Sequence, residues 1–265
     1  MHFAKLNGVT LHYQVIGAPE DKPLLVFSNS LGTDFRIWRD VIFRLAGDYA
    51  LLTYDKRGHG LSDLGETPYT MDDHIGDLAA LLDHLGQRNA VVVGLSVGGL
   101  IAQGLAHRRP DLVRALILCD TAHKIGTAET WADRIAGIEK GGIEALAEAI
   151  LDRWFTPEFQ KTQADAFAGY RNMLVRTPKD GYLGTCVAIR DTDFTEQTKA
   201  LKVPTLCVVG HGDGSTPPDV VRGLSELIEG AEFQIIAQSG HLPCIEQPQV
   251  LAGLIVDFLQ RARIR

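Results

Sequence analysis

The sequence predicts an α/β protein in which a mostly parallel sheet is flanked by helices. Continuous apolar runs of strand length alternate with segments whose apolar residues recur at helical spacing. Such alternation implies right-handed crossovers, which place helices on both faces of a parallel sheet. The alternation stops between residues 122 and 195, where helical patterns follow one another without a strong strand. We therefore expect a core of residues 1–121 and 196–265, with a helical lid of residues 122–195 inserted in it.

Two kinds of pattern predict the strands. Residues 9–15 alternate apolar and polar side chains and are rich in β-formers, which is typical of a half-exposed antiparallel strand at the edge of a sheet. Continuous apolar runs predict strands that are buried on both faces. These runs are residues 24–27, 51–52, 90–93, 115–118 and 205–209, and a strand-like segment at residues 233–236 completes the series.

The helices fall between these strands. After Thr70, apolar residues recur at helical spacing up to residue 85. Thr70 and Asp73 have the spacing of a capping pair, and Gly86 is a typical residue to end a helix. The same reasoning predicts helices at residues 100–107, 143–155 and 248–261.

Composition excludes several classes of protein. The chain has 265 residues, of which 45% are hydrophobic and 22% charged, as in an ordinary globular protein. Its net charge of −7, with no basic block, argues against binding to nucleic acid. The N-terminus lacks the pattern of a secretory signal, and the apolar runs are too short for a membrane helix.

The four cysteines form no C-x-x-C pair, and two of them lie in apolar strand-like runs. We therefore expect free thiols in a reducing cytoplasm rather than a disulfide framework. The cysteines are Cys119, Cys186, Cys207 and Cys244.

The strongest chemical motif is G-x-S-x-G at residues 94–98. It follows an apolar strand and opens a helix, which is the context in which this motif presents a nucleophilic serine on a sharp turn. The residues two before and two after Ser96 would crowd each other, so Gly94 and Gly98 must be small. The alternative is a Gly-Ser turn without a catalytic role. The strand–turn–helix context favours the nucleophile.

A serine needs a base, and the base needs an orienting acid. We expect His241 to be the base and Asp213 the acid, because each follows a predicted strand and the order Ser96, Asp213, His241 is that of an α/β hydrolase triad. Asp120, which follows the strand near residues 115–119, is the reserve acid. His211 is interpreted as a residue at a strand end. The competing interpretation is that His241 and Asp213 are residues of ordinary surface turns.

Two loops are expected to support the serine. We expect the backbone N–H groups of Leu31 and Val97 to stabilise an oxyanion, since Gly32 permits a tight turn and Val97 opens a helix. The loop of residues 55–62 contains Arg57 and His59. Its glycines favour a hydrogen-bonded loop that braces the nucleophile region over a catalytic role.

Other chemistries find no support in the sequence. It has no G-x-G-x-x-G dinucleotide motif, no G-x-x-x-x-G-K-[ST] phosphate loop and no H-E-x-x-H motif. Its histidines and cysteines do not have the spacing of a zinc site. No metal or organic cofactor is implied.

The triad order, the loop of residues 55–62 and the interrupted sheet resemble the α/β-hydrolase superfamily across nearly the whole chain. More narrowly, the chain resembles 3-oxoadipate enol-lactonases of bacterial aromatic catabolism. The residues that carry this narrower resemblance are 29–34 with Trp38, and 121–127 leading to Glu129 and Trp131. The resemblance implies a cytoplasmic, cofactor-free serine hydrolase that opens a small lactone bearing a carboxylate in the β-ketoadipate pathway.

A carboxylate substrate implies a cation in the lid. The insertion offers Lys124, Arg134, Arg153, Arg171, Arg176 and Arg190. Trp131 and Arg134 are three residues apart and would share one face of a helix, which favours Arg134 as the anchor, with Trp131 and Trp154 as pocket walls. Two alternatives stay open: another carboxylesterase or carbon–carbon bond hydrolase on the same core, and a small-molecule receptor.

Overall fold

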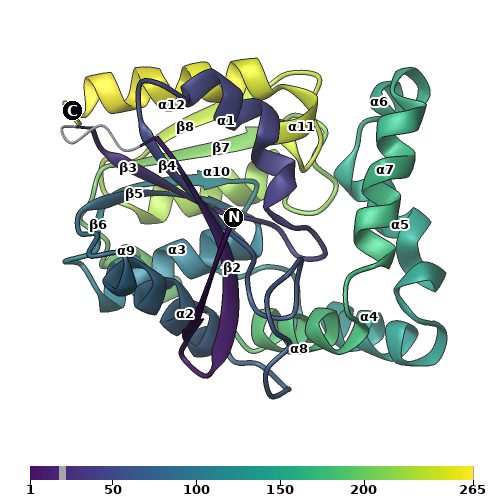
Figure 1. Ribbon diagram of the computed structural model, residues 1–265. Helices are drawn as coiled ribbons and strands as arrows, with labels where there is room; N and C mark the ends of the chain where they lie inside the picture. Colours follow the sequence, from purple (N-terminus) through teal and green to yellow (C-terminus); the bar gives the residue numbers. More distant parts are fainter. Residues whose placement is uncertain (18–21, 265) are drawn as a thin grey trace.

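The computed structural model describes residues 1–17 and 22–264, and in them an eight-stranded sheet is covered by helices on both faces (Figure 1). The strand order is β1-β2-β4-β3-β5-β6-β7-β8, and every pair from β4 to β8 is parallel. The strands are β1 (His2–Leu6), β2 (Val9–Ile16), β3 (Leu24–Ser28), β4 (Ala50–Tyr54), β5 (Ala90–Leu95), β6 (Val113–Cys119), β7 (Thr205–Gly210) and β8 (Glu232–Ile236). The predicted α/β class and the mostly parallel sheet are confirmed.

The predicted strand at residues 9–15 is confirmed as β2, but its place at the edge of the sheet is wrong. β1 lies outside it and pairs with it antiparallel through a two-residue turn. The turn is Asn7-Gly8, with φ 48° and 83°. Positive φ at both positions suits the twist of a two-residue hairpin, and Asn-Gly is the usual sequence for it. The Asn7-Gly8 dipeptide is therefore the feature of the sequence from which the hairpin, and with it β1, could have been predicted.

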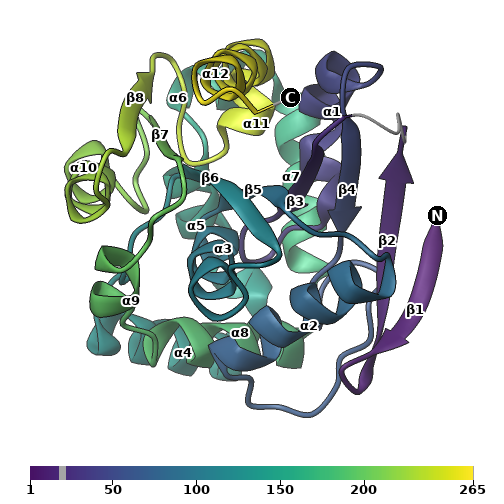
Figure 2. The same cartoon turned by 90° about the vertical axis from the view of Figure 1, so that its left-hand side faces the viewer.

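The apolar strands are buried as expected. Every residue of β3, β5 and β7 is buried, because helices cover both faces of the sheet there. Helices α1 (Arg39–Leu45) and α12 (Pro248–Arg261) pack together on one face, and α2 (Met71–His84) and α3 (Val97–Arg108) on the other (Figures 1 and 2). Parallel strands end at one edge, so the loops that follow β3, β5, β6 and β7 meet there.

Helix boundaries follow the predicted caps. The Thr70 hydroxyl accepts from the Asp73 N–H, and the Asp73 carboxylate accepts from the Thr70 N–H, so α2 begins with a complete capping box. α12 has the predicted bounds, whereas α3 begins at Val97, three residues before the prediction. The single helix predicted at residues 143–155 is wrong in its first turn: a 3-10 turn, η2 (Ile143–Leu146), precedes α5 (Ala147–Trp154). Tightened i→i+3 turns of this kind are common at helix N-termini.

Between β6 and β7 the chain leaves the sheet, and the structure assigns residues 122–195 no strand. The helices of this part are α4 (Ala128–Gly141), η2, α5, α6 (Pro157–Thr162), α7 (Ala164–Val175) and α8 (Lys179–Arg190), and α9 (Thr195–Lys199) leads back to β7. Figure 1 shows α5 to α7 stacked at the right of the molecule, with α4 and α8 along its lower edge. The other helices are η1 (Phe35–Trp38), α10 (Pro218–Leu227) and α11 (Pro243–Glu246).

Two predictions from composition are tested by the described residues. All four cysteines are buried and free, as predicted. None of the described helices combines the length and the apolar character needed to cross a membrane.

Candidate active site

Ser96 lies on a sharp turn between β5 and α3. Its φ of 58° is in the left-handed region, which is strained for a residue with a side chain. The Ser96 N–H donates to the Cys119 carbonyl at 3.0 Å, and the Ser96 carbonyl accepts from the Thr121 hydroxyl at 2.7 Å. The end of β6 therefore holds the backbone of the turn.

Two glycines make this turn sterically feasible. A Cβ atom on Gly94 would overlap the carbonyl group of Gly98, and a Cβ atom on Gly98 would overlap the Ser28 carbonyl at the end of β3. The predicted crowding across the turn is confirmed. It also reaches β3, because α3 starts directly against that strand.

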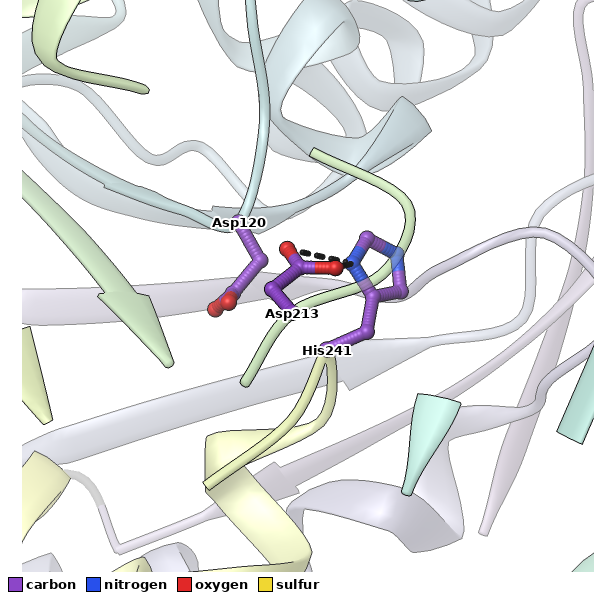
Figure 3. A group of neighbouring side chains, drawn as sticks. All are labelled: Asp120, Asp213 and His241. Atoms are coloured by element: carbon purple, nitrogen blue, oxygen red, sulfur yellow. Dashed lines mark hydrogen bonds and ion pairs between the residues drawn. The ribbon is translucent and has the colours of Figure 1, made fainter. Parts of the chain in front are cut away.

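His241 and Asp213 form a buried hydrogen-bonded pair (Figure 3). The His241 Nδ1 atom lies 3.0 Å from Asp213 Oδ1 and 2.9 Å from Oδ2. Asp213 comes from the loop after β7, and His241 from the loop after β8. Since a carboxylate only accepts, Nδ1 carries the proton, and Nε2 is left as a basic nitrogen.

The environment keeps Asp213 ionised. Burial alone would raise its pKa, but the electrostatic attraction of the His241 ring and hydrogen bonds from His241, Ser215 and Thr216 outweigh it, and the pKa of Asp213 lies below its usual value. The Ser215 N–H donates at 2.7 Å, and the Thr216 hydroxyl at 2.8 Å. Asp213 is thus fixed in place and charged, as an orienting acid requires.

Asp120, the reserve acid, lies beside this pair and makes a different contact. Its Oδ1 atom accepts from the Gly210 N–H at 2.8 Å, whereas Oδ2 is buried without a hydrogen-bond partner. Burial raises the pKa of Asp120 well above its usual value, and the charge of Asp213 raises it further. Asp120 is therefore harder to ionise than Asp213, and Figure 3 shows His241 hydrogen-bonded to Asp213 instead.

The same three residues bring ligand-type atoms within 4.8 Å of one another. A divalent cation is held best by ionised carboxylates whose lone pairs are free. The Asp213 oxygens already accept hydrogen bonds from His241, Ser215 and Thr216, and burial raises the pKa of Asp120, which disfavours its charged form. This cluster suits proton chemistry and does not suit a metal ion.

A cavity of about 370 Å³ brings the predicted residues together. It is lined by Ser96 and His241 from the core, and by Trp131, Arg134 and Trp154 from the segment between β6 and β7. A volume of this order accommodates a small organic molecule. The predicted nucleophile and base thus open into the same space as the predicted substrate-binding side chains.

Trp131 and Arg134 are paired on one face of α4, as their spacing predicts. The Arg134 guanidinium lies 4.9 Å from the centre of the Trp131 ring, within the range of a cation–π contact. The Trp131 ring is also fixed by its Nε1–H, which donates to the Ile125 carbonyl at 2.6 Å. This places a positioned guanidinium at the cavity wall.

The other cations of the insertion are less suited to the cavity. Carboxylates away from the cavity pair with three of them: Asp193 with Lys124, Glu148 with Arg171 and Asp191 with Arg190. Arg176 does not line the cavity. Arg153 does, but it is exposed, whereas Arg134 is half-buried.

The two residues predicted to donate to an oxyanion lie near Ser96. Leu31 lies on the loop after β3 and lines the cavity, and Val97 directly follows Ser96 at the start of α3. Among the described residues, neither the Leu31 N–H nor the Val97 N–H is hydrogen-bonded to an acceptor. Both are therefore available as donors.

The sequence did not indicate that Tyr182 would lie at the cavity. This residue of α8 lines the cavity, and its buried hydroxyl has no hydrogen-bond partner. Burial raises the pKa of Tyr182, opposed by the charge of Arg134. A lone tyrosine in a helical segment has no local pattern that distinguishes it from a packing residue, so only the fold reveals it.

The loop of residues 55–62 is hydrogen-bonded, as predicted, and it contacts α2 and η1. The Arg57 guanidinium pairs with Asp77 of α2, with nitrogen–oxygen distances of 2.7 and 2.6 Å. The Asp55 carboxylate accepts from the Phe35 N–H and from the Leu61 N–H. The loop therefore connects a segment that precedes β4 in the chain with a helix that follows it.

Comparison with known proteins agrees with this arrangement. Residues 23–248 match the family model of the alpha/beta hydrolase fold. The chain is 32% identical over 253 residues to 3-oxoadipate enol-lactonase 2 of Acinetobacter baylyi, covering 96% of this chain and 94% of that protein.

Solved structures give the same result. The crystal structure of the enol-lactonase from Burkholderia xenovorans LB400 superposes with a TM-score of 0.94 at 36% identity, covering 98% of this chain and all of that one. A thermophilic esterase from Thermogutta terrifontis superposes with a TM-score of 0.92 at 26% identity, covering 99% of each chain. With a sheet, a nucleophile turn and an overall sequence of this kind, the chain belongs to the α/β-hydrolase fold family and, within it, is similar to enol-lactonases.

Proposed function

We propose that this chain is a serine hydrolase that opens the ring of 3-oxoadipate enol-lactone to give 3-oxoadipate, within the breakdown of aromatic compounds. The observation that carries the proposal is the cavity in which Ser96 and His241 face Arg134 and Trp131. The names of the relatives, an enol-lactonase at 32% identity and another at 36%, support the lactone as substrate. Hydrolysis of an ester bond is the common chemistry of these relatives.

The proposed triad is Ser96, His241 and Asp213. His241 Nε2 takes the Ser96 proton as the Ser96 Oγ atom attacks the lactone carbonyl, and Asp213 holds the imidazole through Nδ1. The N–H groups of Leu31 and Val97 stabilise the oxyanion. The carbonyl–oxygen bond of the ring then breaks, and the enol oxygen leaves with the proton from His241.

The leaving group explains why hydrolysis is completed. The enol oxygen stays tethered to the acyl chain on Ser96, so closure of the ring competes with hydrolysis. Tautomerisation of the enol to the ketone removes the nucleophile for closure. His241 then activates a water molecule that cleaves the acyl-enzyme and frees Ser96.

Residues 122–195 act, in this proposal, as a lid on a core of residues 1–121 and 196–265. The lid supplies Arg134 for the substrate carboxylate, with Trp131 and Trp154 as walls. Four buried free thiols suit a reducing compartment, and we include the cytoplasm in the proposal on that ground.

The test is a spectrophotometric assay of enol-lactone loss, run beside an aryl ester and a dienone formed by ring fission. We expect kcat/KM to be highest for the lactone. The structural similarity to an esterase makes the aryl ester the main competitor. Fast turnover of only the ester or only the dienone would contradict the lactonase assignment.

Replacing Arg134 by alanine is expected to raise KM for the lactone by about 10- to 100-fold, the value of one charge-assisted hydrogen bond. KM for an aryl acetate, which lacks a carboxylate, should change less than about threefold, because Arg134 has no charge to bind there. The measurement is steady-state kinetics on both substrates.

Arg153→Ala is the matched comparison, since Arg153 is the other lid arginine at the cavity. We expect a smaller rise in KM, because Arg153 is exposed and its contacts are screened by solvent. An unchanged KM in Arg134→Ala with a raised KM in Arg153→Ala would contradict the assignment of Arg134.

A further inference from the structure

A buried lysine lies beneath the loop that carries the proposed oxyanion donor. Lys56 is 1% exposed, although lysine is almost never buried without a charged partner. It begins the loop after β4, and β4 pairs in parallel with β3. The loops after these two strands are therefore neighbours at the carboxyl edge of the sheet.

The Lys56 amine is bound by backbone carbonyls of the loop after β3. Its Nζ atom lies 2.6 Å from the Ser30 oxygen, 3.3 Å from the Asn29 oxygen and 3.5 Å from the Thr33 oxygen. Burial lowers the pKa of Lys56 to about 7, opposed by the charges of Asp55 and Asp34. The shortest contact is to Ser30, whose carbonyl belongs to the peptide unit that contains the Leu31 N–H.

Because the Ser30 carbonyl and the Leu31 N–H share one peptide unit, a contact that holds the carbonyl also fixes the direction of the N–H. A trans peptide is planar, and its C=O and N–H point in opposite directions. The Ser30–Leu31 bond is not among the cis peptide bonds of the described chain. With its oxygen held by Lys56, and by the Thr33 hydroxyl at 2.8 Å, the peptide must direct the Leu31 N–H away from both donors. Leu31 lines the cavity together with Ser96, whereas Lys56 is not among the residues that line it.

His59 fixes the next peptide of the same loop. The Gly32 N–H donates to His59 Nε2 at 3.0 Å, so Nε2 is unprotonated, and Nδ1 donates to the Arg57 carbonyl at 3.1 Å. Burial lowers the pKa of His59 well below its usual value, and the charge of Lys56 lowers it further, so the ring stays neutral. The Gly32 N–H is therefore occupied, which leaves Leu31 as the donor.

We propose that Lys56 is a positioning residue for the oxyanion donor: by binding the Ser30 carbonyl, it orients the Leu31 N–H of the same peptide toward the reacting carbonyl. His59 assists by holding Gly32. The inference rests on the proposed function, since it presupposes that Leu31 is an oxyanion donor. It assigns a role in catalysis to the loop of residues 55–62 beyond bracing the fold.

The test is Lys56→Met, which keeps the length of the side chain and removes its donor. We expect kcat to fall about 100-fold, the lower end of the loss for one oxyanion donor, while KM changes less than about threefold. Binding of an arylboronic acid should weaken by the same factor as kcat. Its boron bonds to Ser96 Oγ, the serine proton passes to His241, and the resulting tetrahedral adduct resembles the intermediate.

Lys5→Met is the matched control, because Lys5 is an exposed lysine of β1, and it should behave as wild type. If Lys56→Met does not fold, as judged by circular dichroism, Lys56→Gln replaces it, since its shorter arm lacks the reach of lysine. A loss in kcat of about tenfold without a change in KM is then expected. A kcat within threefold of wild type, or a loss of product affinity as large as the loss in kcat, would overturn the inference.

Wild-type controls separate this inference from the proposed function. A wild-type protein that neither binds the boronic acid at Ser96 nor hydrolyses any ester would overturn the proposed function. A Lys56 variant that binds the boronic acid as tightly as an active wild type overturns only the inference.

Discussion

Ser96→Ala is expected to lower kcat by about a million-fold, the loss seen when the nucleophile of a serine triad is removed. Without Oγ no acyl-enzyme forms, and His241 has no proton to take. The remaining activity should still exceed that of water, because the donors of Leu31 and Val97 and the substrate-binding side chains are intact. The measurement is kcat on the lactone, with protein purified away from any host hydrolase.

Two controls make the result specific. Ser225→Ala removes a hydroxyl that donates to the Arg222 carbonyl on α10, and it should retain wild-type activity. A fluorophosphonate phosphonylates a serine nucleophile with loss of hydrogen fluoride, and the corresponding increase in mass should appear in wild type and in Ser225→Ala, and not in Ser96→Ala. Wild-type activity in Ser96→Ala would contradict the covalent mechanism.

Those parts of the site that depend on local sequence were predictable. The glycines at 94 and 98 indicate the turn because a Cβ at either position would meet backbone, and that constraint is written into five consecutive residues. The spacing of Trp131 and Arg134 likewise predicts one face of a helix, and the structure pairs them at 4.9 Å. Both inferences use contacts between near neighbours in the chain.

Those parts that depend on distant contacts were less predictable. Asp120 and Asp213 each follow a strand, and β6 and β7 are adjacent, so the order of the residues in the chain favoured Asp213 as the acid but kept Asp120 as a reserve. The loop after β8 decides between them by placing His241 against Asp213. The partners of Lys56 lie 23 to 27 residues away, which is why its role was not visible in the motif.

The missed strand β1 shows a different limit. Its residues are mostly exposed, so no apolar run marks it, and the Asn7-Gly8 turn was the only local signal available within the described hairpin. Only the pairing with β2 makes the segment a strand. An edge strand is defined more by its neighbour than by its own composition.

Asp213→Asn is expected to lower kcat by about 10,000-fold. The Ser215 and Thr216 N–H groups would hold the amide oxygen, which turns the amide NH₂ toward His241 Nδ1. That nitrogen must then accept, so the imidazole proton moves to Nε2, where the base is needed. The measurement is kcat on the lactone, with thermal unfolding to check that the variant is folded.

Asp120→Asn is the matched variant, because it makes the same chemical change at the neighbouring acid. Burial and the charge of Asp213 raise the pKa of Asp120 well above its usual value and so disfavour its charged form, and asparagine is a neutral group of the same shape. The amide oxygen can still accept from the Gly210 N–H. We expect kcat within about tenfold of wild type. Equal losses in the two variants, or a larger loss in Asp120→Asn, would contradict the assignment of Asp213. Asp120 would then contribute at least as much as Asp213 to the orientation of His241.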